Sequence, residues 1–223
     1  MDLFDDIKTH LAKLDVKVVF DVGANIGQSA QSYRKNFTGS KIYCFEPVEE
    51  TFQQLLRTVQ GYDNILSFKL ALSAAKGTGM IVLEGNSDLF FLLNTYRNGQ
   101  VNGGARLEEV NLETVDEFCA EHQIDCINLL KIDTEGGDFD VLKGAGDMLS
   151  RHQIDVVQVE AGMNSKNKRH VPFDIFSKFL EQRHYFLFGI YEQVNEWPTK
   201  ELHLRRTNPV FISDRVIKAN MRR

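Results

Sequence analysis

The sequence has few cysteines and no extended apolar run. Its 223 residues include three cysteines, Cys44, Cys119 and Cys126, and no C-x-x-C pair. An odd count without that spacing indicates neither a disulfide framework nor a zinc site. No segment approaches the roughly 20 apolar residues of a membrane span. The N-terminus, MDLFDDIKTHLAKLD, lacks the apolar core of a signal peptide. We therefore expect no membrane span and a cytoplasmic location.

Positive charge is also scarce, because 26 Lys and Arg face 31 Asp and Glu, a net charge of −5. A broad nucleic-acid surface needs clustered Lys and Arg, so we expect no nucleic-acid partner. The C-terminal region is the exception, with seven basic and two acidic residues in 197–223. We expect residues 214–223 to form a solvated basic tail, with an anion or membrane-surface contact as the alternative.

Strand and helix patterns alternate along the chain. Leu3, Ile7, Leu11 and Leu14 recur at helical spacing, which predicts a helix over residues 1–15. Strands are predicted at 16–22, 41–47, 64–73, 127–133, 155–161, 185–191 and 209–214, and further helices at 28–37, 49–59, 140–149 and 173–182. Strands joined by crossover helices predict an α/β fold with a mainly parallel sheet and helices on both faces. The last two strands have no clear helix between them, so we expect them to pair antiparallel at one edge.

One segment interrupts this alternation. Residues 80–112 are rich in Gly and Asn and have no regular period through their middle. Loops of this length inside a compact domain are usually functional or disordered. We expect a substrate lid or insertion within residues 84–106, with a plain mobile loop as the alternative. Its apolar stretch LFFLL, residues 89–93, is expected to cover a cleft or to form a homodimer contact.

The stretch VVFDVGANIGQ, residues 18–28, predicts a strand, a Gly-rich turn and a helix. In a dinucleotide-binding G-x-G-x-x-G turn, the second Gly lets the backbone approach a pyrophosphate. Counted from Gly23, that position holds Asn25, and Gly27 falls one residue early. Asp21 adds a carboxylate where a phosphate would otherwise be favoured. An ammonium group would be attracted there instead, and S-adenosylmethionine (SAM) carries one at its methionine end.

Two more strand ends support a nucleoside ligand. Glu46 follows the second strand, 23 residues after Gly23, where a carboxylate can accept hydrogen bonds from a ribose diol. NAD enzymes use such a residue too, so Glu46 alone does not discriminate. Ser73, at the end of the third predicted strand, could bond the adenine edge or simply begin a loop.

Acidic residues gather at the ends of two later strands. Asp133 and Glu135 follow LLKI, and we expect them on one side of the strand because they are two residues apart. Glu160 ends the next strand and should reach the same crevice. These three carboxylates are candidates for a general base, and they could also bind a divalent cation. Alternatively, a carboxylate there caps the helix that begins near Asp138.

The loop GMNSKNKRHVP, residues 162–172, follows Glu160 and is basic. We expect either a solvated loop or one that holds a polar acceptor. His170 is its candidate acid–base residue, although a lone His is most often not catalytic.

The motifs DVGANIG, CFEP, ALS and KIDTEGGDFDVLKGA, in that order, resemble the FkbM family of SAM-dependent methyltransferases over roughly residues 17–213. The resemblance implies a Rossmann-like class I methyltransferase fold, in three layers, with a seven-stranded mostly parallel sheet whose last strand is antiparallel. It implies O-methylation, often of sugar hydroxyls in glycans or natural products, with S-adenosylhomocysteine (SAH) as product. The last acidic position of the family pattern D-x-E-G-x-E is here Asp138.

Together these patterns predict a single methyltransferase domain over residues 1–223. The predicted cofactor contacts are Asp21, Gly23, Ala24, Asn25, Gly27, Glu46, Pro47, Ser73 and Asp133. The predicted catalytic candidates are Asp133, Glu160, Glu135 and His170, and the candidate metal ligands are Asp133, Glu135 and Glu160. The acceptor is expected to be a small molecule or glycan, with a protein acceptor as the alternative. A non-catalytic nucleotide-binding module and an NAD-dependent oxidoreductase are the alternatives of another class.

Overall fold

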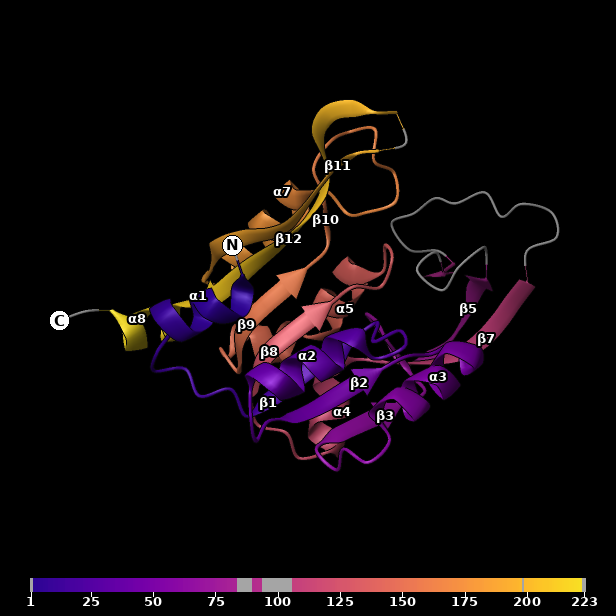
Figure 1. The fold of residues 1–223 in the computed structure, drawn as a ribbon, viewed down its shortest axis with the longest axis horizontal. Coiled ribbons are helices and arrows are strands. Elements are labelled where there is room, and N and C mark those ends of the chain that lie inside the picture. The colour runs from indigo at the N-terminus through magenta and orange to yellow at the C-terminus, as the bar shows by residue number, and fades with distance from the viewer. Residues whose placement is uncertain (1, 84–89, 94–105, 198, 222–223) are drawn as a thin grey trace.

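The computed structural model describes residues 2–83, 90–93, 106–197 and 199–221 (Figure 1). Its main sheet has eight strands in the order β10-β12-β9-β8-β1-β2-β3, with β11 beside β12. Their bounds are β1 Val18–Val22, β2 Lys41–Phe45, β3 Ile65–Phe68, β8 Ile127–Ile132, β9 Ile154–Val159, β10 Ala161–Gly162, β11 Tyr185–Glu196 and β12 Glu201–Ser213. The pairs among β3, β2, β1, β8 and β9 are all parallel, and β12 is antiparallel to both β9 and β11.

Without the two-residue β10, the sheet has seven strands. The last of these in the chain, β12, runs antiparallel to its neighbours. This confirms the predicted class of fold and the antiparallel pairing of the last two strands. Strands β8 and β9 are buried along nearly their whole length, and four of the six residues are apolar in each of their sequences, INLLKI and IDVVQV.

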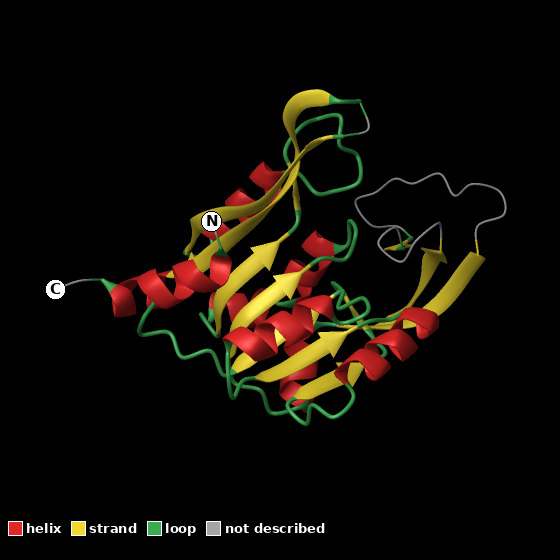
Figure 2. Ribbon diagram, in the orientation of Figure 1, coloured by secondary structure: helices red, strands yellow, loops and turns green. Residues whose placement is uncertain are grey.

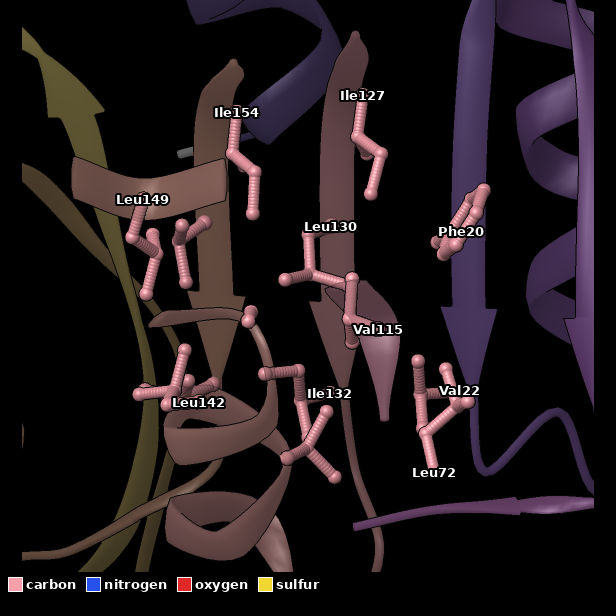
Figure 3. Close-up of a cluster of buried hydrophobic side chains, with 14 of the residues drawn as sticks. Phe20, Val22, Leu72, Val115, Ile127, Leu130, Ile132, Leu142, Leu149 and Ile154 are labelled. Atoms are coloured by element: carbon pink, nitrogen blue, oxygen red, sulfur yellow. The ribbon is translucent and has the colours of Figure 1, made fainter. Parts of the chain in front are cut away.

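Helices cover both faces of the sheet, so the fold has three layers (Figure 2). Their bounds are α1 Leu3–His10, α2 Gln28–Asn36, α3 Glu49–Val59, α4 Val115–Glu121, α5 Asp138–Gly144, α6 Gly146–Ser150, α7 Phe173–Glu181 and α8 Asp214–Asn220. One core cluster packs α1, α2, α3 and α8 against the sheet, and the other packs α4 to α7 against the opposite face. Figure 3 shows part of the second cluster, in which Leu130 and Ile132 of β8 lie between Leu142 of α5 and Phe20 of β1.

A second, four-stranded sheet occupies much of the region predicted to lack regular structure. Its order is β4-β7-β5-β6, with β4 Ala71–Leu72, β5 Gly77–Leu83, β6 Phe91–Leu92 and β7 Arg106–Glu113. β5 and β7 pair antiparallel along their length, so both flanks of the segment 80–112 are strands. The prediction of one strand over 64–73 is also wrong, because β3 ends at Phe68 and β4 joins the second sheet. Most of the predicted lid, residues 84–89 and 94–105, lies outside the described residues.

Both chain ends differ from their predictions. The first helix ends at His10, although Leu11 beyond it remains buried in the core. The predicted basic tail begins with a helix, α8, rather than a solvated chain. Val216 of α8 is buried, and Arg215 Nη2 lies 2.6 Å from Asp155 Oδ1. Among the described residues, no helix is both long and apolar enough to cross a membrane.

The β11–β12 hairpin is longer than predicted and extends beyond the main sheet, at the top of Figure 1. The loop 163–170 packs against this extension. Asn164 Nδ2 donates to the carbonyl of Leu204 at 2.7 Å, and the Met163 N–H donates to the carbonyl of Arg205 at 3.0 Å. The hairpin and this loop therefore form one wall beyond the carboxyl ends of the parallel strands.

Gly144 tests how tightly α5 packs against the chain at the end of β4 in the second sheet. A Cβ atom at Gly144 would lie 2.0 Å from the backbone oxygen of Ser73. We expect Gly144→Ala to lower the free energy of unfolding by about 1–3 kcal/mol, because a backbone contact cannot yield easily. Urea unfolding followed by circular dichroism measures the change.

Gly146→Ala is the matched control, because nothing lies within 4 Å of a Cβ atom at that position. We expect it to leave stability unchanged or raise it by up to about 1 kcal/mol, since Ala favours helix over Gly. Equal effects of the two substitutions would contradict the close packing at Gly144.

Candidate active site

The Gly-rich turn after β1 uses its own amides to hold itself in place. The N–H groups of Gly23 and Ala24 both donate to the carbonyl of Phe45 at 3.0 Å, and the Asn25 N–H donates to Glu46 Oε2 at 3.1 Å. Phosphate-binding turns need free N–H groups directed at the ligand. These three amides already have partners within the protein, so the geometry disfavours a diphosphate at this turn.

Glycine is required at two positions of this turn. Gly23 and Gly27 have φ angles of 74° and 94°. A Cβ atom on Gly23 would lie 1.8 Å from the backbone oxygen of Asp133, and one on Gly27 would lie 2.9 Å from Leu55 Cδ1. The first contact brings the turn against the end of β8, and the second seats α2 against α3. The glycines thus allow close backbone packing.

Asp21 lies beneath the turn, where it forms a buried ion pair with Lys131. The two residues are directly opposite in the β1–β8 register, and Lys131 Nζ lies 3.0 Å from Asp21 Oδ1. Asp21 is fully buried. Burial raises the pKa of Asp21, an effect that the Lys131 charge opposes. Burial acts to lower the pKa of Lys131, but the charges of Asp21 and Asp133 leave it raised. The structure therefore gives Asp21 a protein partner where the sequence predicted a ligand ammonium.

Glu46 closes the other side of the turn. Its Oε2 accepts from the Asn25 N–H and its Oε1 accepts from the Val48 N–H at 3.0 Å. Burial raises the pKa of Glu46 to about 7, against the lowering effect of these two bonds. Each carboxylate oxygen can accept a further hydrogen bond, so the side chain can still bind a pair of hydroxyl groups.

The segment after β8 is a turn, in contrast to the predicted continuation of the strand. β8 ends at Ile132, and Glu135 has a φ angle of 58°, a left-handed conformation that is uncommon for residues other than glycine. Asp138 Oδ2 accepts from the Thr134 N–H at 3.4 Å, the Thr134 hydroxyl at 3.0 Å and the Gly136 N–H at 3.3 Å. Asp138 therefore stabilises this turn at the start of α5, and the turn directs Glu135 toward the basic loop.

Glu160 contacts a guanidinium group and an imidazole ring at the end of β9. Its Oε1 lies 2.5 Å from Arg206 Nη1, and its Oε2 lies 2.7 Å from His170 Nε2. Burial acts to raise the pKa of Glu160, but the hydrogen bond and charge of His170, with Arg206, hold that pKa below its usual value. The Glu160 carboxylate thus stays ionised although it is 5% exposed.

The basic loop is folded into the site, which corrects the view of it as a solvated loop. Arg169 Nη2 lies 2.5 Å from Glu135 Oε2, and His170 is 4% exposed. Asn167 Nδ2 lies 2.8 Å from His170 Nδ1 and donates to the carbonyl of Arg205 at 2.9 Å. Asn167 Oδ1 lies 3.1 Å from the same Nδ1, so Asn167 fixes the orientation of the ring and directs Nε2 at Glu160.

Glu135, Glu160 and His170 bring ligand atoms within 4.8 Å of one another, a spacing that a divalent cation could use. The predicted ligands were Asp133, Glu135 and Glu160. In the structure His170, and not Asp133, lies with the two glutamates. Arg169 and Arg206 already contact the two carboxylates, so a cation would have to displace both guanidinium groups. The protein's own cations thus balance the charge that a metal would otherwise neutralise.

A cavity of about 380 Å³ joins the Gly-rich turn to Glu160. Nine predicted site residues line it: Gly23, Ala24, Asn25, Glu46, Pro47, Ser73, Asp133, Glu135 and Glu160. The other predicted site residues, Asp21, Gly27 and His170, do not line it. Asp133 is reachable from the cavity, because 37% of its side chain is exposed. Burial raises the pKa of Asp133, an effect that the Lys131 charge opposes.

The cavity also has polar residues that the sequence reasoning missed: Gln28, Ser29, Lys131, Thr134, Glu192 and Arg206. A lysine inside the apolar strand INLLKI was a signal for Lys131, since a buried lysine needs a carboxylate partner. Glu192 and Arg206 come from the hairpin extension, and no spacing in the sequence indicated that they reach the site.

Three apolar residues from the predicted lid region, Phe90, Phe91 and Leu92, also line the cavity. Phe91 is 3% exposed, and Phe90 and Leu92 pack beside the small core of the second sheet. These contacts favour a cleft-covering role for the stretch over a dimer contact. The predicted homodimer stays a prediction.

The buried ion pair generates a stability prediction. We expect Lys131→Met to lower the free energy of unfolding by about 3–5 kcal/mol, because it leaves the Asp21 charge buried without a partner. Adding Asp21→Asn should recover part of that loss. Urea unfolding of the single and double variants measures both changes.

Lys178→Met is the matched control, since Lys178 is exposed and pairs with Asp174 within one helix. It should change stability by no more than about 0.5 kcal/mol. A similarly small effect at Lys131 would show that the buried pair does not support the fold.

Glu135 generates a pH prediction. Burial, together with the charge of Glu160, raises the pKa of Glu135 to about 8, although Arg169 acts to lower it. Between the unfolded pKa of about 4.3 and this value, the folded protein binds more protons, so its stability falls as the pH rises. Glu135→Gln removes this titration. The difference in Tm, variant minus unaltered protein, should therefore increase between pH 5 and pH 8.5. Thermal unfolding at each pH measures it. A difference that does not change with pH would contradict the raised pKa.

Comparison with known proteins agrees with this site. The sequence profile of the methyltransferase FkbM domain matches residues 21–187. The hexuronic acid methyltransferase AglP of Haloferax volcanii is 24% identical over 153 residues, which cover 67% of this chain and 59% of AglP. The 2-O-methyltransferase NoeI of Sinorhizobium fredii is 22% identical over 152 residues, which cover 60% of this chain and 59% of NoeI.

The chain thus spans less than two thirds of the length of these relatives. Among solved structures, a precorrin-6y C5,15-methyltransferase from Geobacter metallireducens has a TM-score of 0.50 and 11% identity, over 93% of this chain and 87% of that one. This likeness shows the fold. The profile match covers most of the chain and includes the turn, Glu46, Asp133 and Glu160. The chain belongs to the FkbM family of SAM-dependent methyltransferases.

Proposed function

We propose that this protein transfers a methyl group from SAM to a hydroxyl of a sugar in a glycan or natural product. The observation that carries the proposal is the single cavity that joins the Gly-rich turn and Glu46 to the buried carboxylate of Glu160. One end suits a nucleoside without phosphates, and the other offers a base to a hydroxyl group. We also propose that residues 1–223 act as one methyltransferase domain, since both core clusters share the main sheet.

Several residues fit the parts of SAM. Glu46 can accept from the ribose hydroxyls, and Ser73 lies at the cavity wall near apolar residues that suit an adenine ring. Gln28 and Ser29 begin α2, where the helix dipole favours the methionine carboxylate. When bound, SAM supplies an electrophilic methyl group on a sulfonium. The task of the protein is then to align the acceptor oxygen, and positioning of this kind can lower a barrier by about 7–11 kcal/mol.

Glu160 is the strongest candidate for the general base. It lines the cavity and is ionised, so it can accept a proton from a hydroxyl group, although its lowered pKa makes it a weaker base than a carboxylate with a raised pKa. Asp133 is the second candidate, because its carboxylate is reachable from the cavity and burial raises its pKa. His170 lies behind Glu160 and outside the cavity lining, so it would act on the proton only through Glu160. Glu135 also lines the cavity but is held by Arg169.

The sugar acceptor is supported by two relatives, one named for hexuronic acid and one named as a 2-O-methyltransferase. A polar cavity edge formed by Glu160 and Arg206 also suits a molecule with several hydroxyl groups. Another small molecule or a protein remains the alternative acceptor. The acidic residues around the cavity make a nucleic acid a poor candidate.

Calorimetry with SAH and NAD in parallel tests the class of the protein. We expect SAH to bind and NAD not to bind, because the turn amides are already bonded. Binding of NAD alone would indicate an oxidoreductase, and binding of neither would indicate a non-catalytic module.

Methyl transfer to a panel of glycans, deoxysugars and peptides, read by mass, tests the acceptor. A gain of one methyl group on a sugar would support the proposal, and a gain only on a peptide would overturn the sugar assignment. The same reactions with EDTA test the metal alternative, since activity lost to the chelator and restored by magnesium would show that a cation acts at the site.

Glu160→Gln tests the general base. We expect turnover to fall by about 10²–10⁴-fold, the usual contribution of general acid–base catalysis. The dissociation constant for SAH should change little, because Glu160 lies on the acceptor side. Unchanged turnover would remove Glu160 from the mechanism. Glu109→Gln, at an exposed position on β7, is the control and should alter neither quantity.

A further inference from the structure

Most carboxylates at the site already face a cation of the protein. Asp21 pairs with Lys131, Glu135 with Arg169, and Glu160 with Arg206. Asp133 Oδ2 lies 3.6 Å from Lys131 Nζ, and Glu46 is held by two backbone N–H groups. These side chains have little uncompensated negative charge to offer a ligand.

Glu46 has no such cation among the described residues, but it accepts from two backbone N–H groups and is assigned to the ribose hydroxyls. In the described part of the chain, Glu192 is a second cavity carboxylate without a cation. It lines the same cavity, yet no Lys, Arg or His nitrogen of the described chain lies within 4.0 Å of its carboxylate. Its polar partner is neutral, since Asn208 Nδ2 donates to Glu192 Oε2 at 2.7 Å. The carboxylate is therefore held in place while its charge stays available.

The backbone at Glu192 is irregular, and the residue is exposed where it lines the cavity. The register of β11 against β12 shifts between Tyr191 and Val194, so a bulge interrupts the hairpin there. Bulges commonly redirect a side chain next to an active site. Glu192 also has a φ angle of 47°, a left-handed conformation that is uncommon for residues other than glycine. Asn208, which holds Glu192, is 8% exposed.

Glu192 lines a cavity that also reaches the start of α2. Gln28 and Ser29, at the start of α2, line the cavity together with Glu192. Burial raises the pKa of Tyr33 of α2, and the charges of Asp21 and Glu192 raise it further. This long-range effect agrees with a position of the Glu192 carboxylate on the α2 side, where the methionine end of SAM is expected.

The methionine end carries an ammonium group that needs an acceptor. Asp21 is occupied by Lys131 and does not line the cavity. The carbonyl of Gly23 also accepts from Lys131 Nζ, at 3.1 Å. We propose that Glu192, delivered by the hairpin bulge and held by Asn208, binds the ammonium group of SAM. This inference rests on the proposed use of SAM. It adds a contact between the β11–β12 hairpin and the cofactor.

Calorimetry with two probes tests the contact. SAH carries the ammonium, whereas 5′-methylthioadenosine has the same adenosine and sulfur but no amino-acid end. We expect Glu192→Gln to raise the dissociation constant for SAH by about tenfold, because a charge-assisted hydrogen bond becomes a neutral one. The dissociation constant for 5′-methylthioadenosine should stay the same. Glu192→Asp should recover part of the affinity for SAH.

Two controls separate charge from shape. Gln193→Ala changes the neighbouring residue of the same bulge and should leave both constants unchanged. The affinity of the unaltered protein for SAH should fall with salt more steeply than that of Glu192→Gln, since one charge pair is absent from the variant.

The outcomes are distinct. An unchanged SAH constant in Glu192→Gln would overturn the inference, and so would an equal loss for both probes, which would indicate a change in cavity shape. If the unaltered protein binds neither probe, the proposed use of SAM fails and the inference fails with it.

Discussion

The buried contact between Asp21 and Lys131 is the interaction on which the arrangement of the site depends. It links the two central strands, β1 and β8, at the point where both leave the sheet. Lys131 also donates to the carbonyl of Gly23 and lies near Asp133. Taking two charges out of water is costly, so such a pair contributes more to a defined geometry than to net stability. Here it fixes the Gly-rich turn against the end of β8.

The remainder of the site is assembled from two distant parts of the chain. The parallel strands supply Glu46, Asp133 and Glu160 at their carboxyl ends, where ligands bind in open α/β sheets. The β11–β12 extension supplies Arg206 and Glu192, and the loop 163–170 that packs on it supplies the cations that face Glu135 and Glu160. The parallel strands therefore supply carboxylates of the site, and the hairpin and the loop 163–170 supply the side chains that pair with Glu135 and Glu160.

This division of charge explains how carboxylates of one site can differ in chemistry. The contacts of Glu160 with His170 and Arg206 hold its pKa low, whereas burial dominates at Glu46 and Glu135 and raises their pKa values. A site with these differences can offer hydrogen-bond acceptors to a nucleoside at one end and an ionised base at the other. The absence of free amides in the turn at Gly23, Ala24 and Asn25 agrees with a cofactor that lacks phosphates.

The sequence by itself determined the class of fold, the motifs at the ends of the parallel strands and nine residues of the cavity wall. Periodicity and Gly-rich turns are local signals, so Gly23, Glu46, Asp133 and Glu160 could be placed at strand ends without coordinates. Only the tertiary structure decided the partners of these residues. A strand side chain can face either side of a sheet, and the register set Asp21 against Lys131 and away from the cavity. The contributions of Arg206, Glu192 and His170 depend on a bulged hairpin and a folded loop, because long-range packing brings them to the site and no local pattern records it.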